Sequence, residues 1–300
     1  MADILIKGII DGYVNVYAID GREMVEEARL THGTWPVCTA ALGRALMATA
    51  MMAEMIKHDD GRLSVTIKGG GPAGSIVTAG RPGGFVKGYI DEPRVDLPTN
   101  AKGKLDVGGA VGRDGRLTVV KDLGMKEPYS GSVRLVSGEL GEDFAAYFAI
   151  SEQQPAAVYL GVMISPDEKV LSAGGFIIMP MPQCPEETIQ KLENAMPRAL
   201  KMSAELAAGK PISNFLISAF EGMDFKVTET GGATFECDCG EDRIEQVLVS
   251  LGKEELEDML VQDDGAEITC HFCMKKYTFS GDELRRVIDD ASQPNNGARQ

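Results

Sequence analysis

The chain has 300 residues, of which 44% are hydrophobic and 25% are charged, enough for one large domain or about two to three smaller ones. No stretch approaches the roughly 18 uninterrupted apolar residues of a membrane helix, and the N-terminus lacks the basic start and apolar run of a signal peptide. We therefore expect a cytoplasmic protein with no membrane partner. The net charge of −15 is uneven, because residues 1–180 carry a balance of −4 and residues 181–300 a balance of −11.

Residues 1–179 are predicted to form a mixed α/β domain, within a chain of the α+β class. Two strands, 4–10 and 14–18, flank an Asp11-Gly12 hairpin signal. A helical pattern without proline extends from Thr39 to about Lys57. The remainder of this part predicts a helix near 141–154 and strands at 63–68, 75–79, 84–90, 117–122, 132–136, 158–164 and 170–179.

Residues 180–230 are interpreted as a helical linker, because several prolines mark a change in composition at its start. A helix is predicted over 186–196, and Pro197 is expected to kink or restart it. A further short helix is predicted to begin at Pro211, and a strand follows at 225–230. Short, interrupted helices depend on tertiary packing, so we do not expect this stretch to form an autonomous core.

The last compact unit is predicted over residues 231–291, followed by a flexible tail over 292–300. It contains two amphipathic helix patterns, two short strand patterns and a final helix for which Ser280 and Glu283 form a capping box. A domain of about sixty residues buries little apolar surface, so we expect a metal ion to stabilise it.

Four of the six cysteines form two close pairs, Cys237-Asp-Cys239 and Cys270-His-Phe-Cys273. Two such pairs joined by a long spacer are typical of one tetrahedral Zn²⁺ held by four thiolates, so we predict one Zn²⁺ per chain. The competing interpretation is four unliganded cysteines that lie near one another. An oxidant would turn the tight Cys237/Cys239 pair into a small-ring disulfide, so these atoms suit either a structural clamp or a switch.

The other cysteines and the histidine of the second pair carry weaker signals. Cys38 and Cys184 have no close partner in the sequence and are interpreted as structural. His271 is an alternative metal ligand, but Cys270 beside it already supplies that position.

Several further patterns are interpreted as structural. Residues 69–74 match G-x-G-x-x-G, but a strand and not a helix follows them, so a turn is favoured. Four methionines at helical spacing predict core packing, with a client-binding or dimer surface as the alternative; they are Met47, Met51, Met52 and Met55. The sequence contains no phosphate loop, H-E-x-x-H motif or Ser/His/Asp arrangement, so we do not expect an enzyme.

Several short motifs are spread along the chain beside the two cysteine pairs: His32-Gly33-Thr34-Trp35-Pro36, Ala41-Leu42-Gly43-Arg44, Lys68-Gly69-Gly70-Gly71-Pro72, Val119-Val120-Lys121-Asp122-Leu123-Gly124, Val136-Ser137-Gly138-Glu139-Leu140 and Ala173-Gly174-Gly175-Phe176. With the cysteine pairs, these segments resemble the 33 kDa chaperonin family, the redox-regulated heat-shock chaperones of bacteria. The resemblance covers nearly the whole chain, and its combination of motifs is specific.

The resemblance implies a substrate-binding and dimerisation domain over 1–179, a linker over 180–230 and a zinc redox-switch domain over 231–291. It assigns the zinc-ligand role to Cys237, Cys239, Cys270 and Cys273, and it implies the disulfides Cys237–Cys239 and Cys270–Cys273 after oxidation. It also implies an ATP-independent holdase that is inactive when reduced and zinc-bound. Its partners would be unfolded client proteins and, on activation, a second copy of the chain.

Two other functional classes remain as alternatives. A zinc-dependent thiol oxidoreductase would place a C-x-x-C motif at a helix start in a βαβ context, which the sequence does not predict. A zinc ribbon that binds nucleic acid would need a basic face, whereas residues 181–300 are strongly acidic. We therefore expect no nucleic-acid partner.

Overall fold

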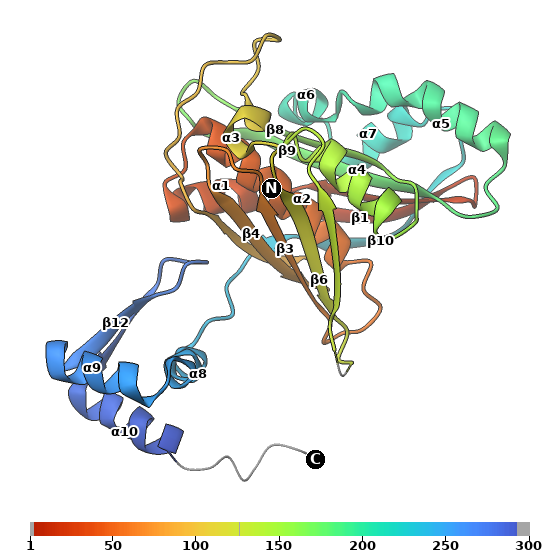
Figure 1. Cartoon of the computed structure of the whole chain (residues 1–300). Coiled ribbons are helices and arrows are strands. Elements are labelled where there is room, and N and C mark those ends of the chain that lie inside the picture. The colour runs from red at the N-terminus through yellow and green to blue at the C-terminus, as the bar shows by residue number, and fades with distance from the viewer. Residues whose placement is uncertain (1–2, 126, 293–300) are drawn as a thin grey trace. The chain divides into compact units, whose positions relative to one another are not determined.

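The computed structural model describes residues 3–125 and 127–292, with side chains as far as residue 288. The chain forms two compact units, Met1–Glu236 and Cys237–Gln300 (Figure 1). Both units mix helices and strands, so the predicted α+β class is confirmed. The predicted flexible tail, 292–300, lies outside the described residues apart from Ser292, at which the last helix ends.

The first unit contains a five-stranded antiparallel sheet with the strand order β10-β1-β2-β9-β8. The predicted hairpin between β1 and β2 is confirmed, because Asp11 and Gly12 both have positive φ angles, of 50° and 75°. The strands are β1 Ile4–Ile10, β2 Val14–Asp20, β8 Ala157–Ile164, β9 Val170–Pro180 and β10 Phe225–Gly232.

A second sheet of six strands has the order β11-β5-β4-β3-β6-β7. Its glycine-rich segment, 69–74, is the turn between β3 and β4, as predicted. A Cβ at Gly71 would lie 2.4 Å from the carbonyl oxygen of Ala110, so this close approach needs glycine. The strands are β3 Arg62–Lys68, β4 Ser75–Arg81, β5 Phe85–Ile90, β6 Arg116–Asp122, β7 Tyr129–Arg134 and β11 Thr234–Phe235.

Helix α2, Pro36–Ala53, packs against both sheets and forms the centre of the first unit (Figure 1). Met47, Met51 and Met52 are buried in it, and Met55, just beyond its end, is half-buried against the same core, so their core interpretation is confirmed. Within the described residues, α2 is the helix long and apolar enough to cross a membrane by length and composition alone. However, 89% of this helix is buried inside the structure, as in the core helix of a globular domain.

Three shorter helices complete this part: α1 Arg22–His32, α3 Val107–Val111 and α4 Gly141–Ile150. Helix α1 was not predicted from the sequence, because its buried face is narrow and consists of only three residues, Met24, Val25 and Ala28. Its first turn is held from outside the helix, since the carboxylate of Asp3 accepts hydrogen bonds from the backbone N–H groups of Glu23 and Met24.

The predicted linker residues lie within the first unit and form α5 Glu186–Ala199, α6 Met202–Ala207 and α7 Ile212–Ala219. Side chains alternate between the two faces of the five-stranded sheet. One face packs against α5–α7, and the other face packs against α2. The helix continues through Pro197 and breaks at Leu200–Lys201, so the predicted kink is displaced. Pro197 has no backbone N–H to donate, so it weakens the hydrogen bonding of the last turn of α5.

The second unit contains α8 Glu241–Leu251, α9 Lys253–Asp263, α10 Gly281–Ser292 and the hairpin of β12 Gly265–Thr269 with β13 Lys276–Ser280. The predicted capping box is confirmed, because the Glu283 carboxylate accepts from the Ser280 N–H at 2.8 Å. Its buried core is small and comprises Ile244, Leu248, Leu256, Tyr277, Phe279, Leu284, Val287 and Ile288.

Candidate metal centre

The four paired cysteines lie on two loops of the second unit. Cys237 and Cys239 belong to the irregular segment before α8, and Cys270 and Cys273 belong to the turn between β12 and β13. This turn is closed by hydrogen bonds from Met274 N–H to the carbonyl oxygen of Cys270 and from Cys270 N–H to that of Lys275. Met274 adopts a φ of 58°, and the chain enters β13 two residues later.

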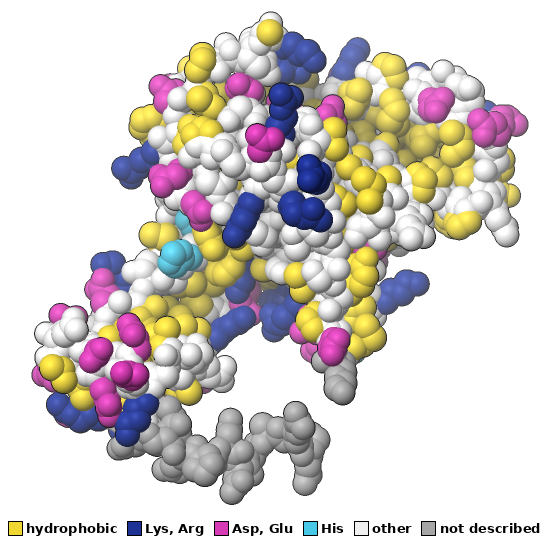
Figure 2. Space-filling view, in the orientation of Figure 1, with side chains coloured by type: hydrophobic (Ala, Val, Ile, Leu, Met, Phe, Trp, Pro, Cys, Tyr) yellow, Lys and Arg dark blue, Asp and Glu magenta, His cyan; other side chains and the backbone are white. Residues whose placement is uncertain are grey.

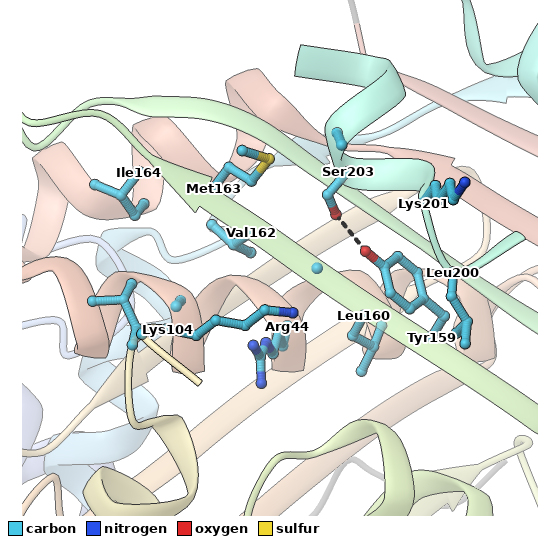
Figure 3. A pocket seen from close by; sticks show the side chains of 15 residues that line it. Arg44, Lys104, Tyr159, Leu160, Val162, Met163, Ile164, Leu200, Lys201 and Ser203 are labelled. Carbon is cyan, nitrogen blue, oxygen red and sulfur yellow. Dashed lines mark hydrogen bonds between the residues drawn. The ribbon is translucent and has the colours of Figure 1, made fainter. Parts of the chain in front are cut away.

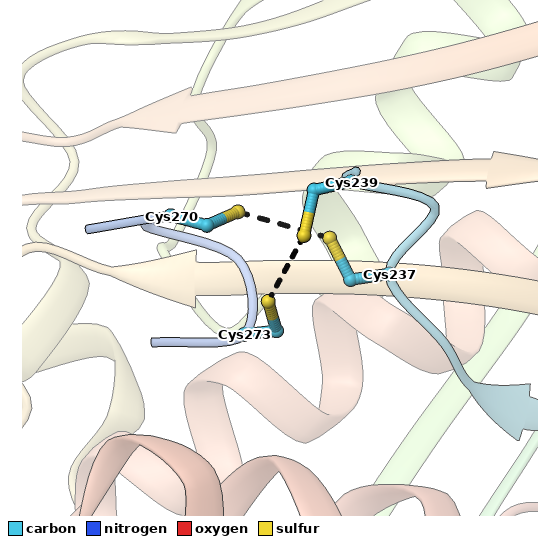
Figure 4. A group of neighbouring side chains, drawn as sticks. All are labelled: Cys237, Cys239, Cys270 and Cys273. Carbon is cyan, nitrogen blue, oxygen red and sulfur yellow. Dashed lines mark hydrogen bonds between the residues drawn. The ribbon is translucent and has the colours of Figure 1, made fainter. Parts of the chain in front are cut away.

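The four sulfur atoms converge on one point (Figure 4). Their Sγ atoms all lie within 4.8 Å of one another, with 3.8 Å between Cys237 and Cys270 and 3.3 Å between Cys239 and Cys273. A tetrahedral ion with metal–sulfur bonds of about 2.3 Å places its sulfurs about 3.8 Å apart. The cluster therefore has the size and donor set of a four-thiolate metal site.

Tyr277 of β13 adds a hydrogen bond to this cluster that sequence reasoning did not identify. Its hydroxyl donates to the Sγ of Cys239 at 3.1 Å. Burial raises the pKa of the Cys239 thiol, but the hydrogen bonds from Tyr277 and the neighbouring thiols outweigh burial and lower this pKa to about 7. Burial raises the pKa of the Cys273 thiol, and the bond to Cys239 raises the pKa of Tyr277.

The sequence and the fold of the chain match one family of known proteins. A family model described as Hsp33 protein matches residues 3–280. The chain belongs to the Hsp33 family. The predicted resemblance is thereby confirmed.

Named relatives of this Hsp33 chain extend over nearly its full length. A 33 kDa chaperonin from Alkaliphilus metalliredigens is 45% identical over 277 residues, covering 92% of this chain and 95% of the relative. One from Shouchella clausii is 44% identical over 292 residues, covering 97% and 99%. The crystal structure of a 33 kDa chaperonin from Thermotoga maritima has a TM-score of 0.87 and 35% identity, covering 96% of this chain and 98% of that chain.

The remaining predicted candidates lie apart from the sulfur cluster of this Hsp33 chain. Cys38 is fully buried in α2, where its thiol donates to the carbonyl oxygen of Glu92, and burial raises its pKa. Cys184 is half-buried in the loop before α5. His271 is exposed in the turn between the cysteines of the second pair and does not belong to the described ligand cluster.

Four sulfur ligands would fill the coordination shell of a tetrahedral ion. A catalytic zinc site keeps a position for water or substrate, usually beside three protein ligands. The donor set of this Hsp33 chain leaves no such position, so the cluster is suited to holding two loops together. It is also suited to thiol chemistry, because every sulfur has another sulfur nearby.

Proposed function

We propose that this Hsp33 chain is a redox-regulated, ATP-independent chaperone that holds unfolding client proteins and is not an enzyme. The relatives carry the name 33 kDa chaperonin, and a chaperone family implies client binding. The observation that carries the regulation is the set of four sulfur atoms within 4.8 Å in the small unit. We further propose that the protein acts in the cytoplasm and that its active form is a homodimer.

In the reduced state, we propose that Cys237, Cys239, Cys270 and Cys273 hold one Zn²⁺ per chain. The sulfur separations and the closed donor set support this assignment. A bound zinc ion would supply an apparent binding free energy of about 10–16 kcal/mol. The second unit has only eight buried hydrophobic residues in its described core, so its folding would depend strongly on these four side chains.

Oxidation by peroxide would remove the ligands. One thiolate of a pair attacks H₂O₂ to give a sulfenic acid and, after protonation, water. The partner thiol then attacks that sulfur, forming an S–S bond and releasing a second water. Two such reactions consume two peroxide molecules and leave Cys237–Cys239 and Cys270–Cys273, a pairing we propose from the family resemblance. None of the four sulfurs then remains a thiolate able to hold the ion.

The segment before Cys237 provides the surface that would be exposed on activation. Helices α5–α7 cover an apolar face of the five-stranded sheet, and hydrophobic side chains remain visible around α5 and α7 in Figure 2. Ile217 and Leu200 are 60% and 54% exposed even in this conformation. We propose that loss of order in the second unit frees these helices, so that apolar surface becomes available to clients.

The test compares reduced, zinc-loaded protein with protein treated with peroxide at elevated temperature. We expect oxidised protein to suppress light scattering by a chemically denatured client and reduced protein to leave it unchanged. The variant Cys270→Ser should bind zinc at least about 100-fold more weakly, whereas Cys184→Ser, outside the cluster, should behave as wild type. If Cys270→Ser keeps both its zinc and its dependence on oxidant, the proposed switch is wrong.

A further inference from the structure

One face of the six-stranded sheet carries a row of three cations. Lys68 of β3 lies directly opposite Arg116 of β6, and Arg116 lies directly opposite Arg134 of β7. Residues in directly opposite positions point to the same face of a sheet, and neighbouring strands lie about 4.8 Å apart. All three side chains are exposed. Figure 2, in the orientation of Figure 1, shows several Lys and Arg side chains over this sheet.

Packing within the first unit does not explain this cation row. Like charges directly opposite each other destabilise a sheet, and none of the three cations has an acidic partner among the residues that the structure describes. On β4 the row ends at Ser75, which lies opposite Lys68 and donates its N–H to the carboxylate of Asp91 at 2.8 Å. A row that costs stability and has no internal counter-ion is suited to an external anion.

The middle cation of the row is held in position. Nε of Arg116 donates to the Ser132 hydroxyl at 2.8 Å, and one terminal nitrogen donates to the Ser132 carbonyl oxygen at 3.1 Å. The other terminal nitrogen has no partner among the described residues. The planar fork of a guanidinium matches the geometry of carboxylates and phosphates. Arg116 is therefore oriented before any anion arrives.

The surroundings of the row favour an acidic polypeptide over a nucleic acid. Proteins that bind single-stranded nucleic acid combine cations with aromatic side chains on which the bases stack. The next residues on the same face of the sheet are small, namely Ser132, Thr118, Thr66 and Val77. The aromatic side chain in line with them, Tyr89, belongs to β5, two strands beyond β3. The cations thus have hydroxyl groups beside them and no surface for base stacking.

The cation row does not depend on the helices that we propose are released. β3, β6 and β7 pack against α2 and α4, whereas α5–α7 cover the five-stranded sheet. A groove beside β8 has α6 as its wall, where the hydroxyl groups of Ser203 and Tyr159 are hydrogen-bonded at 2.9 Å (Figure 3). That groove would be lost with α6, but the cation row would persist in the oxidised protein.

We propose that Lys68, Arg116 and Arg134 bind acidic segments of client proteins. This inference rests on the proposed chaperone function and adds a charge preference to it. The chain has 45 acidic and 30 basic residues, so its overall field repels an acidic client. The cation row supplies a local attraction, and it would orient such a client while the apolar surface freed by α5–α7 binds the client's apolar segments.

The test uses the oxidised full chain and a short fluorescent peptide in which Ser and Asp alternate. The double variant Lys68→Glu/Arg134→Glu should bind this peptide at least about tenfold more weakly than wild type. Because opposite charges then flank Arg116, the same variant should unfold at a higher urea concentration than wild type. This gain in stability shows that the variant is folded, so that lost binding is not lost structure.

Lys102→Glu/Lys169→Glu is the matched control. It makes the same change in net charge at two exposed lysines in other loops, and it should bind the Asp peptide as wild type does. A peptide with Asn in place of Asp should bind all three proteins equally weakly, because the proposed contact is between charges.

The outcomes separate the cation row from the general function. If wild type suppresses client aggregation but Lys68→Glu/Arg134→Glu binds the Asp peptide as tightly as wild type, the row assignment is overturned and the chaperone function stands. The assignment is also overturned if the control variant loses as much affinity, or if wild type prefers a single-stranded oligonucleotide of equal charge to the Asp peptide. If wild type fails in the aggregation assay while peptide binding still depends on the row, the chaperone function fails instead.

Discussion

Gly161 lies where β8 packs against α6. A Cβ at this position would lie 2.0 Å from Oγ of Ser203 and 2.6 Å from the hydroxyl oxygen of Tyr159. Gly161→Ala should therefore lower the free energy of unfolding of the first unit by about 1–3 kcal/mol, as measured by urea denaturation of the reduced protein. Removing the Ser203 hydroxyl should relieve part of this cost, so Gly161→Ala/Ser203→Ala should be less destabilised than the sum of the single variants.

Gly231 provides the matched control for this substitution. It lies in β10, and a Cβ there would meet nothing within 4 Å. Gly231→Ala should change the free energy of unfolding by no more than about 0.5 kcal/mol. If both variants are equally stable, the described packing of α6 against β8 is incorrect.

At the same scale, the cysteine quartet could be predicted from the sequence, whereas Tyr277 could not. The close spacing within each cysteine pair can be read directly from the sequence, and two such pairs are typical of a metal site. The hydrogen bond from Tyr277 to Cys239 joins residues 38 positions apart. It depends on how β12 pairs with β13 and where the first cysteine loop lies, and no local pattern encodes either.

The linker helices are held by one apolar face, and α7 shows this most clearly. Leu216 is fully buried against the sheet, whereas its neighbour Ile217 is 60% exposed. Leu216→Ala should reduce the stability of the first unit by about 2–5 kcal/mol. Because the lost packing lies between helix and sheet, we expect faster proteolysis within 200–220 and partial suppression of client aggregation without oxidant.

Ile217→Ala is the control, because it shortens an exposed side chain in the same turn of α7. The free energy of unfolding of this variant should lie within about 0.5 kcal/mol of wild type. Its rate of proteolysis within 200–220 should match that of wild type. Equal protection of the linker in Leu216→Ala and wild type would show that this face does not hold the helices on the sheet.

The elements themselves were predictable where their pattern is strong. Strand patterns predicted the strands of both sheets apart from β11, with β7 placed too far toward the C-terminus, and a long apolar stretch predicted α2. The short helix α3 was not predicted. The prediction failed for α1, whose narrow buried face depends on α2 and β9. The prediction also placed the helix break too early, at Pro197. The last turn of α5 stays helical as far as Ala199, which is buried in the core.

At the scale of the whole molecule, the contrast in charge and the cysteine pairs indicated a distinct C-terminal unit, but the topology was not predictable. β10 and β11 follow helices α5–α7 in sequence yet pair with β1 and β5, more than 140 residues earlier. Such long-range pairing depends on the register of strands that are already in place. As a result, residues 180–236 are built into the first unit and end directly before Cys237.

The central claim is that four thiolates keep the protein inactive by holding a metal ion. The most direct test follows zinc release, free thiols and client light scattering in one sample during peroxide treatment. The account predicts that one zinc ion per chain and four thiols are lost together, in step with the gain in aggregation suppression. Suppression that appears while zinc and thiols are retained, or loss of both without any suppression, would contradict it.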